Sequence, residues 1–415
     1  MRALIAGAGS AGDVNPLVAV GRALAGRGHE VALCANAGFA RDALASGLEF
    51  VPSSGEDELL DLLRSERLVR QASAPFLVIE SVLRGAAGLV AALEEEIARR
   101  RPDVLLRHHV AIGARWVAER HGIPCAVAVV TPSQWHSARD LARADGEVAA
   151  VVKRLVFRAA LLLVARPLCA LTFDRGIRAA ARRLGFPAES RAWLRELREG
   201  AMVLGLWSKH FRPPFPDDPE RSVVTGFAFH DRSHSDGAWE AEIGAFLDAG
   251  EPPVVFSLGS TVVHSPRDFW TAAAEACRRL SLRAIFLSGG AAHAADLPGG
   301  VRAFAAAPFA SLFPRARAVV HHGGIGSTAQ AIRAGKPALV VPFVLDQPDV
   351  ADRARRLGVA RVLPRARVTA ESLARELERL LADTEVERRA AALGEKIRAE
   401  DGAAAAAKAV ESLVR

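Results

Sequence analysis

Short apolar runs alternate with amphipathic stretches along almost the whole chain. In the first half the apolar runs are RALIA, EVALCA, LEFVP, DVLLRH, PCAVAVV and AMVLGLW, and helical patterns lie between them, as at residues 17–25 and 114–120. Continuous apolar runs of this length indicate strands that are buried on both faces of a parallel sheet, with helices as crossovers. From Glu147 to about Arg198 the pattern predicts mainly helix.

A polar, proline-rich segment interrupts this alternation at residues 211–238. Its start, FRPPFPDDPE, contains four prolines, which suits a linker better than the interior of an element. The alternation then resumes with PPVVFSLGS, RAIFLSG, VRAFA, RAVVHHGG, PALVVPF and ARVLP. We therefore predict a first domain over residues 1–210, a second over 239–390, and a C-terminal helix over 391–415 that packs back toward the first domain. The predicted fold class is α/β, with two Rossmann-like, doubly wound parallel-sheet domains and a cleft between them.

Composition narrows the choice of partners and compartment. The 415 residues carry a net charge of +7, but the excess arginines are scattered and form no basic block with interleaved aromatic residues, so no nucleic-acid partner is predicted. The four cysteines are far apart and suggest neither a zinc site nor a disulfide framework. The first apolar run resembles a strand and not a signal peptide, and the run at 155–164 is too short to span a membrane. We expect a cytoplasmic enzyme, with peripheral contact at the inner membrane face as a further option.

The first glycine motif, GAGSAG at residues 7–12, is followed at once by Asp13. A dinucleotide site is disfavoured, because EVALCANAG provides no acidic residue for a ribose and the charge of Asp13 would face a pyrophosphate. Two interpretations of Asp13 remain. It is either a first-turn acid that stabilises the helix, or a carboxylate at the sheet edge that accepts a proton from a hydroxyl group.

The second motif spans residues 318–353 and contains HHGGIGSTAQ. A strand delivers His321 and His322 to a glycine turn, after which a helix begins. Free backbone N–H groups at such a helix start favour a diphosphate. The predicted donor-binding residues here are His322, Gly324, Gly326, Ser327 and Thr328, together with Ser260 at the end of the SLGS turn, Thr261 after it, and Ser10 and Gly12 in the first loop. Asp346 and Gln347 are predicted to bind sugar hydroxyls, and helix capping by Asp346 is the alternative.

Over essentially its whole length the sequence resembles the family-1 glycosyltransferases of the GT-B fold. The resemblance is carried by GSAGDVNP at 9–16, RGHEVALC at 27–34, SLGS at 257–260 and the segment 321–347. GIP at 122–124, PS at 132–133 and VTGF at 224–227 look most like the bacterial rhamnosyltransferases of rhamnolipid synthesis, and natural-product glycosyltransferases are also similar.

This resemblance implies an inverting transfer of a sugar from a nucleoside diphosphate, without a metal or another cofactor. Asp13 matches the catalytic base. His322, Gly326 and Ser327 match ligands of the leaving diphosphate, and Asp346 with Gln347 matches the pair that holds the donor sugar. The chain has Gln330 where many users of UDP-sugars have a ribose-binding glutamate, and Ala306 where plant members stack the base on tryptophan. Both departures favour a dTDP-deoxysugar such as dTDP-rhamnose, with a UDP-hexose as the alternative.

The acceptor is expected at the first domain. Residues 148–173 are unusually apolar, and they form either core or a wall for a lipid or natural-product acceptor. On the second interpretation Phe157, Leu162 and Trp135 contact the acceptor. Two other functions remain open at this point: a sugar-nucleotide 2-epimerase, and a non-catalytic auxiliary protein that keeps the fold.

Overall fold

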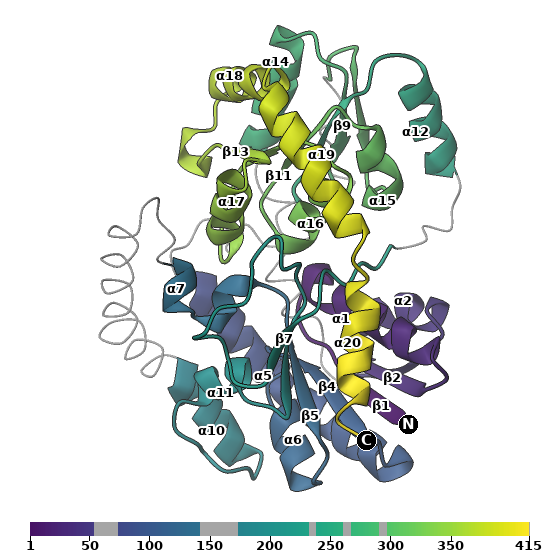
Figure 1. Ribbon diagram of the computed structural model, residues 1–415, viewed down its shortest axis with the longest axis vertical. Coiled ribbons are helices and arrows are strands. Elements are labelled where there is room, and N and C mark those ends of the chain that lie inside the picture. The colour runs from purple at the N-terminus through teal and green to yellow at the C-terminus, as the bar shows by residue number, and fades with distance from the viewer. Residues whose placement is uncertain (54–73, 142–172, 232–237, 260–266, 290–296, 415) are drawn as a thin grey trace. The chain divides into compact units, whose positions relative to one another are not determined.

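The computed structural model describes residues 1–53, 74–141, 173–231, 238–259, 267–289 and 297–414. These residues form two compact units, each built on a parallel sheet (Figure 1). The first unit contains Met1–Leu59, Pro75–His230 and Asp401–Arg415, and the second contains Asp231–Glu400. The predicted fold class, two α/β domains with parallel sheets, is confirmed.

In the described residues, the first sheet has seven parallel strands in the order β3-β2-β1-β4-β5-β6-β7. The strands are β1 (Arg2–Ala6), β2 (Glu30–Ala35), β3 (Glu49–Pro52), β4 (Val104–His108), β5 (Cys125–Val129), β6 (Met202–Gly205) and β7 (Ser222–Val224). The helices are α1 (Ala11–Ala25), α2 (Ala40–Ala45), α5 (Ala74–Arg100), α6 (Ala114–Arg120), α7 (Ala138–Leu141), α10 (Arg175–Arg183), α11 (Ala192–Arg198) and α20 (Gly402–Glu411).

Alternate residues of β1 face different helices. Leu4 and Ala6 belong to the apolar cluster that includes residues of α5 and α6. Ile5 points to the opposite face, where it approaches Gly21 of α1 so closely that a Cβ there would lie 3.0 Å from its Cδ1. The sheet is therefore covered on both faces, and the carboxyl ends of its buried central strands are left as the place for a site.

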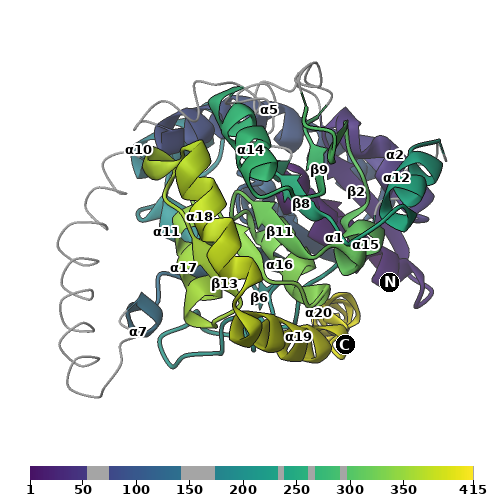
Figure 2. The same ribbon diagram turned by 90° about the horizontal axis from the view of Figure 1, so that it is seen from above.

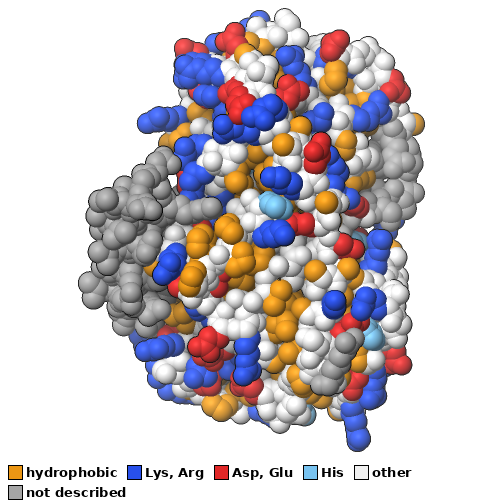
Figure 3. Space-filling view, viewed as in Figure 1, with side chains coloured by type: hydrophobic (Ala, Val, Ile, Leu, Met, Phe, Trp, Pro, Cys, Tyr) orange, Lys and Arg blue, Asp and Glu red, His pale blue; other side chains and the backbone are white. Residues whose placement is uncertain are grey.

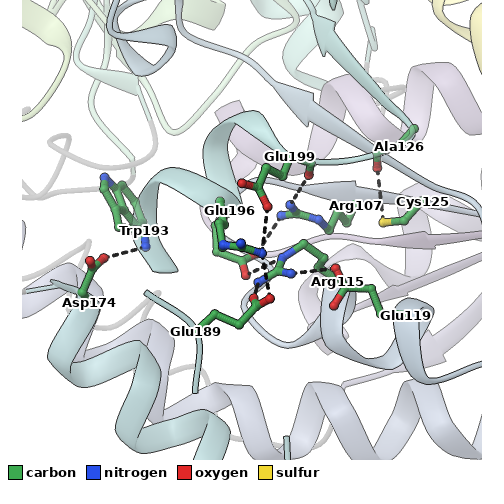
Figure 4. Close-up of polar contacts among 11 residues, drawn as sticks. Arg107, Arg115, Glu119, Cys125, Ala126, Asp174, Glu189, Trp193, Glu196 and Glu199 are labelled. Atoms are coloured by element: carbon green, nitrogen blue, oxygen red, sulfur yellow. Dashed lines mark hydrogen bonds and ion pairs between the residues drawn. The ribbon is translucent and has the colours of Figure 1, made fainter. Parts of the chain in front are cut away.

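Buried ion pairs fix α11 beside the sheet. Arg107 of β4 lies 2.9 Å from the Glu196 carboxylate, and Arg115 of α6 donates to the other oxygen of Glu196 at 3.2 Å (Figure 4). Arg107 and Glu196 are both fully buried. Removal of one partner from such a network leaves an uncompensated buried charge, which costs about 3–5 kcal/mol.

The predicted linker at 211–238 has ordered structure in its first twenty residues. Arg212 is fully buried and contacts the carboxylates of Asp140 and Asp218. The strand β7, which the apolar pattern did not predict, then joins the edge of the sheet beside β6. Residues up to His230 belong to the first unit.

In the described residues, the second sheet has six parallel strands in the order β10-β9-β8-β11-β12-β13 (Figure 2). They are β8 (Val254–Ser257), β9 (Ala284–Leu287), β10 (Val301–Phe304), β11 (Ala318–His321), β12 (Ala338–Val340) and β13 (Ala360–Val362). The helices are α12 (Ala238–Asp248), α14 (Arg267–Arg279), α15 (Phe309–Leu312), α16 (Ile325–Arg333), α17 (Gln347–Arg356), α18 (Ala370–Leu381) and α19 (Thr384–Arg398). Val254, Phe256 and Val320 pack with α14 and α18, whereas Val255 and Val319 pack on the opposite face.

The predicted C-terminal helix consists of two helices. The backbone leaves α19 at Ala399, and the Asp401 side chain then accepts a hydrogen bond from Ala404 N at 2.9 Å, which starts α20. The helix α20 packs along α1, and Glu411 receives hydrogen bonds from Arg27 at 2.6 and 2.8 Å.

Positive and negative side chains are interspersed on the surface shown in Figure 3. The mixture of Lys and Arg with Asp and Glu on this face is in keeping with the scattered arginines of the sequence. Within the described part of the chain, no helix is both long enough and apolar enough to cross a membrane.

Candidate active site

The loop after β1 encloses the carboxylate of Asp13. Gly9 has a φ of 111°, and a Cβ atom there would lie 2.5 Å from Asp13 Oδ2. The Asp13 carboxylate thus lies against the glycine turn at the N-terminus of α1, where its charge would repel a pyrophosphate.

Asp13 uses its two carboxylate oxygens differently. Oδ2 accepts hydrogen bonds from Ser10 N at 2.7 Å and from Ser10 Oγ at 2.9 Å, and these contacts complete a capping box at the start of α1. Oδ1 lies 3.7 Å from His108 Nε2, and the side chain is 30% exposed. Burial raises the pKa of the Asp13 carboxyl, so it is a stronger base than an ordinary aspartate. Asp13 can therefore stabilise the start of α1 through Oδ2 and accept a proton through Oδ1, so the two interpretations from the sequence do not exclude each other.

Ser10 and Gly12 take part in holding Asp13. The Ser10 hydroxyl donates to Asp13 and accepts from Gly12 N at 3.3 Å. Its proton is therefore not available to a phosphate. The structure gives Ser10 a positioning role where the sequence predicted donor binding.

Two histidines at the end of β4 were not predicted as part of the site. His108 and His109 are buried with their rings 4.2 Å apart. Burial lowers the pKa of His108 to about 3 and that of His109 well below its usual value, so both rings are neutral near neutral pH. The sequence contained a signal for them, because His108 ends the strand DVLLRH, His109 follows it, and parallel strands end at the same sheet edge.

In the second unit, the turn between β11 and α16 holds His322 between two glycines. A Cβ atom at either Gly259 or Gly324 would overlap the imidazole ring of His322. Gly259, after β8, and Gly324, before α16, therefore both pack against the His322 ring. Burial lowers the pKa of His322 to about 4, so near neutral pH the ring carries no charge and has a single N–H, and the ring also forms a hydrogen bond with the Ser257 backbone.

The N-terminus of α16 lacks a side-chain cap. Gly324 is its N-cap residue, and within the described residues the helix start has no side-chain cap hydrogen bond. In an α-helix the first N–H groups have no carbonyl partner within the helix, and here they belong to Ile325, Gly326 and Ser327. A Cβ at Gly326 would meet no atom of the described residues within 4 Å, so there is room beside the first turn of α16 at this residue.

Thr328 takes part in the first turn of α16. Its backbone N–H and its hydroxyl both donate to Gly324 O, each at 3.0 Å. The hydroxyl thereby reinforces the start of the helix, and a role for Thr328 in donor binding stays a prediction.

The loop between β12 and α17 is fixed by Gln347. Its Oε1 accepts from Phe343 N at 2.9 Å and from Val344 N at 3.1 Å, and the side chain is buried. The side-chain N–H groups of Gln347 therefore remain for a sugar hydroxyl. From the sequence, both its N–H groups and its Oε1 were candidates for this contact. Asp346 occupies the N-cap position of α17 without a side-chain cap hydrogen bond, so the capping alternative is not observed.

The remaining predicted residues fall into two groups. Ser260, Thr261, Phe157 and Leu162 lie outside the described residues, as does almost all of the apolar 148–173 segment. Trp135 is fully buried, with its ring edge-on to Trp207 at 4.6 Å. Its ring packs within the first unit, and a contact between Trp135 and the acceptor stays a prediction.

Comparison with known proteins agrees with the two-unit organisation. The Glycosyltransferase family 28 N-terminal domain matches residues 3–138, and the Erythromycin biosynthesis protein CIII-like, C-terminal domain matches residues 285–413. The O-mycaminosyltylonolide 6-deoxyallosyltransferase of Streptomyces fradiae is 31% identical, over 97% of this chain and 95% of its own length.

Solved structures share the fold. The glycotransferase of kitacinnamycin has a TM-score of 0.77 at 24% identity, over 100% of this chain and 99% of its own. The glycosyltransferase VinC, solved in complex with dTDP, has a TM-score of 0.70 at 20% identity, over 100% and 99% of the two chains.

The fold and the sequence matches together define a glycosyltransferase of the GT-B fold. The chain belongs to the family-1-like, nucleotide-sugar-dependent glycosyltransferases of natural-product type, so the family predicted from its motifs is confirmed.

Proposed function

We propose that this enzyme transfers a 6-deoxyhexose, such as rhamnose, from dTDP to a hydroxyl group of a hydrophobic acceptor, with inversion at the anomeric carbon. The acceptor class is a natural-product aglycone or a lipid, and a UDP-hexose is the alternative donor. The observation that carries the proposal is the uncapped N-terminus of α16 beside a buried, neutral His322. The named activity of the Streptomyces fradiae relative and the dTDP bound to VinC support the choice of donor class.

The donor half of the proposal concerns the leaving group. The first N–H groups of α16 and the positive end of its dipole bind the diphosphate. The His322 ring, which forms a hydrogen bond with the Ser257 backbone, lies beside these groups, and Ser327, with 6% of its surface exposed, adds its backbone N–H. As the bond between C1 and the phosphate oxygen breaks, these donors stabilise the electron pair that moves to the diphosphate. On this account they take the place of a divalent cation, and the transfer is independent of metal.

The acceptor half concerns Asp13. The acceptor oxygen forms the new bond to C1 from the face opposite the diphosphate, and Asp13 Oδ1 takes the hydroxyl proton. Ser10 keeps Oδ2 fixed, so the carboxylate has one oxygen for structure and one for chemistry. The raised pKa of Asp13 helps it to hold the proton once transferred.

A donor screen tests this function. Thermal melts with dTDP, UDP and GDP at about 100 times Kd correspond to about 2.7 kcal/mol of stabilisation, or a shift of a few °C. We expect dTDP to give the largest shift, and release of dTDP from a dTDP-6-deoxyhexose with a macrolide aglycone to persist in EDTA. Proton NMR of the product should show the anomeric configuration opposite to that of the donor. A retained configuration, or a complete loss of turnover in EDTA, would contradict the proposal.

A further inference from the structure

The solvent-facing side of α16 continues beyond its N-terminus as a polar stripe. Buried residues occupy most of the helix, whereas Gly326, Gln330 and Arg333 reach the surface at spacings of four and three residues. These spacings place the three residues on one helix face. A ligand that binds at Gly326 and extends along the helix therefore meets Gln330 next.

Asp231 is held over this stripe. Its Oδ1 accepts from Gln330 Nε2 at 3.0 Å and from Arg333 Nη1 at 3.0 Å, and its Oδ2 lies 2.9 Å from Arg333 Nη1. The Asp231 and Arg333 side chains are 37% and 32% exposed. An exposed pair of this kind contributes only about 0–1 kcal/mol to stability, so the fold does not depend on it. A carboxylate has about four lone-pair positions, and these contacts leave acceptor capacity on Oδ2.

The position of this carboxylate matches the reach of a nucleotide. Gln330 lies four residues beyond Gly326, which is about 6 Å along the helix axis. In a nucleoside diphosphate the sugar is joined to the phosphates through C5′, so a diphosphate at the start of α16 brings the sugar hydroxyls to about one helical turn further along. Carboxylates are common partners of nucleoside-sugar hydroxyls in nucleotide-binding folds.

We propose that Asp231 binds the 3′-hydroxyl of the donor nucleoside, with Gln330 beside it and Arg333 fixing its orientation. The segment that precedes the second sheet thereby supplies the carboxylate that α16 does not carry at position 330. The hydroxyl donates to Asp231 Oδ2, and the amide of Gln330 holds Oδ1. This assignment rests on the proposed function, because it assumes that a nucleoside diphosphate binds at α16.

The test compares dTDP with 2′,3′-dideoxythymidine diphosphate, which lacks the 3′-hydroxyl, by calorimetry. For the unmodified protein we expect dTDP to bind about 10-fold more tightly, in line with one hydrogen bond to a charged group. In Asp231→Asn this preference should fall to about 1-fold, while affinity for the dideoxy compound stays the same. The matched control is Asp248→Asn, which alters another exposed Asp–Arg pair of the same unit, with Arg315, and should keep the preference.

A charge relocation sharpens the test. Gln330→Glu alone sets two carboxylates side by side and should weaken dTDP binding. Gln330→Glu combined with Asp231→Asn moves the carboxylate to position 330, and this variant should again bind dTDP at least about 3-fold more tightly than the dideoxy compound. An Asp231→Asn protein that still prefers dTDP 10-fold overturns this inference but leaves the proposed function intact. An unmodified protein that binds neither compound overturns both.

Discussion

The two units use the same strand–glycine–helix turn in opposite ways. At the start of α1, Ser10 and Asp13 form a capping box, so the helix end is occupied by a carboxylate of the protein itself. At the start of α16 the N-cap residue is Gly324, and in the part of the chain that the structure describes no side-chain cap hydrogen bond is formed there. One turn therefore holds a base, and the other leaves its N–H donors for an anion from outside.

The glycines of the two turns differ in the same sense. Gly9 makes room for the Asp13 carboxylate, whereas Gly259 and Gly324 make room for the His322 ring. In both units the missing side chain of the glycine makes room for a side chain of the protein itself. A glycine motif thus indicates that another group lies close to the backbone. Its neighbours in the structure show whether that group is a ligand or a side chain.

The largest effect is expected from Asp13→Asn. Loss of a general base reduces kcat by about 10²–10⁴-fold, while dTDP affinity should remain unchanged because the diphosphate binds elsewhere. Burial raises the pKa of Asp13, and the ionised form is the active one, so kcat/KM should fall as pH decreases through a pKa above the usual aspartate value. Steady-state kinetics against pH measures both.

The control for this prediction is Asp103→Asn. Asp103 also accepts a backbone hydrogen bond, from Arg2 N at 2.6 Å, but lies away from the loop of Asp13. It should leave kcat and the acid limb unchanged. If Asp13→Asn kept more than a tenth of the activity with the same acid limb, Asp13 could not be the base.

An intermediate effect is expected when the second turn is made to resemble the first. Gly326→Asp places an acid in the first turn of α16, where it favours the helix by about 0.3–1 kcal/mol but repels a diphosphate. At about 4 Å this repulsion is roughly 1–4 kcal/mol, so calorimetry should show dTDP affinity lowered about 10- to 100-fold. Gly326→Ala is the matched control, because a Cβ there meets no atom within 4 Å and affinity should change less than about 3-fold. Equal binding by both variants would contradict the account.

The smallest effect is expected from Gly259→Ala. The added methyl group displaces the His322 ring and with it the turn that precedes α16, so we expect dTDP binding to weaken by about 10-fold. Gly28→Ala is the control: its φ of 85° imposes the same kind of backbone strain, but no atom lies within 4 Å of the new Cβ. Both variants should melt at lower temperature, whereas only Gly259→Ala should change the Kd for dTDP.

Much of the fold could be predicted from the apolar pattern, because strands buried on both faces have continuous apolar runs. EVALCA and RAVVHHGG are examples, and both contain strands of the structure, β2 and β11. The strand β7 was missed because it has three residues and follows a proline-rich segment. The helix α1 begins at Ala11 and not near Leu17, because the Ser10 cap starts it before Pro16.

The candidate site was less predictable, because its details depend on contacts between distant residues. Asp231 and Gln330 are 99 positions apart, and no local pattern links them. Thr328 matched a phosphate motif, but its hydroxyl donates a hydrogen bond to the Gly324 carbonyl oxygen. Trp135 is an aromatic residue near a loop, yet its burial follows from its contact with Trp207. Residue types indicated the chemistry, and three-dimensional contacts assigned which atoms remain available.

A crystal structure of the enzyme with dTDP tests the contrast between the two turns most directly. The account predicts both phosphates within hydrogen-bond distance of the backbone N–H groups of Gly326 and Ser327, with the Asp13 loop unchanged. Phosphates bound at Ser10–Gly12, or bound away from the N-terminus of α16, would contradict it.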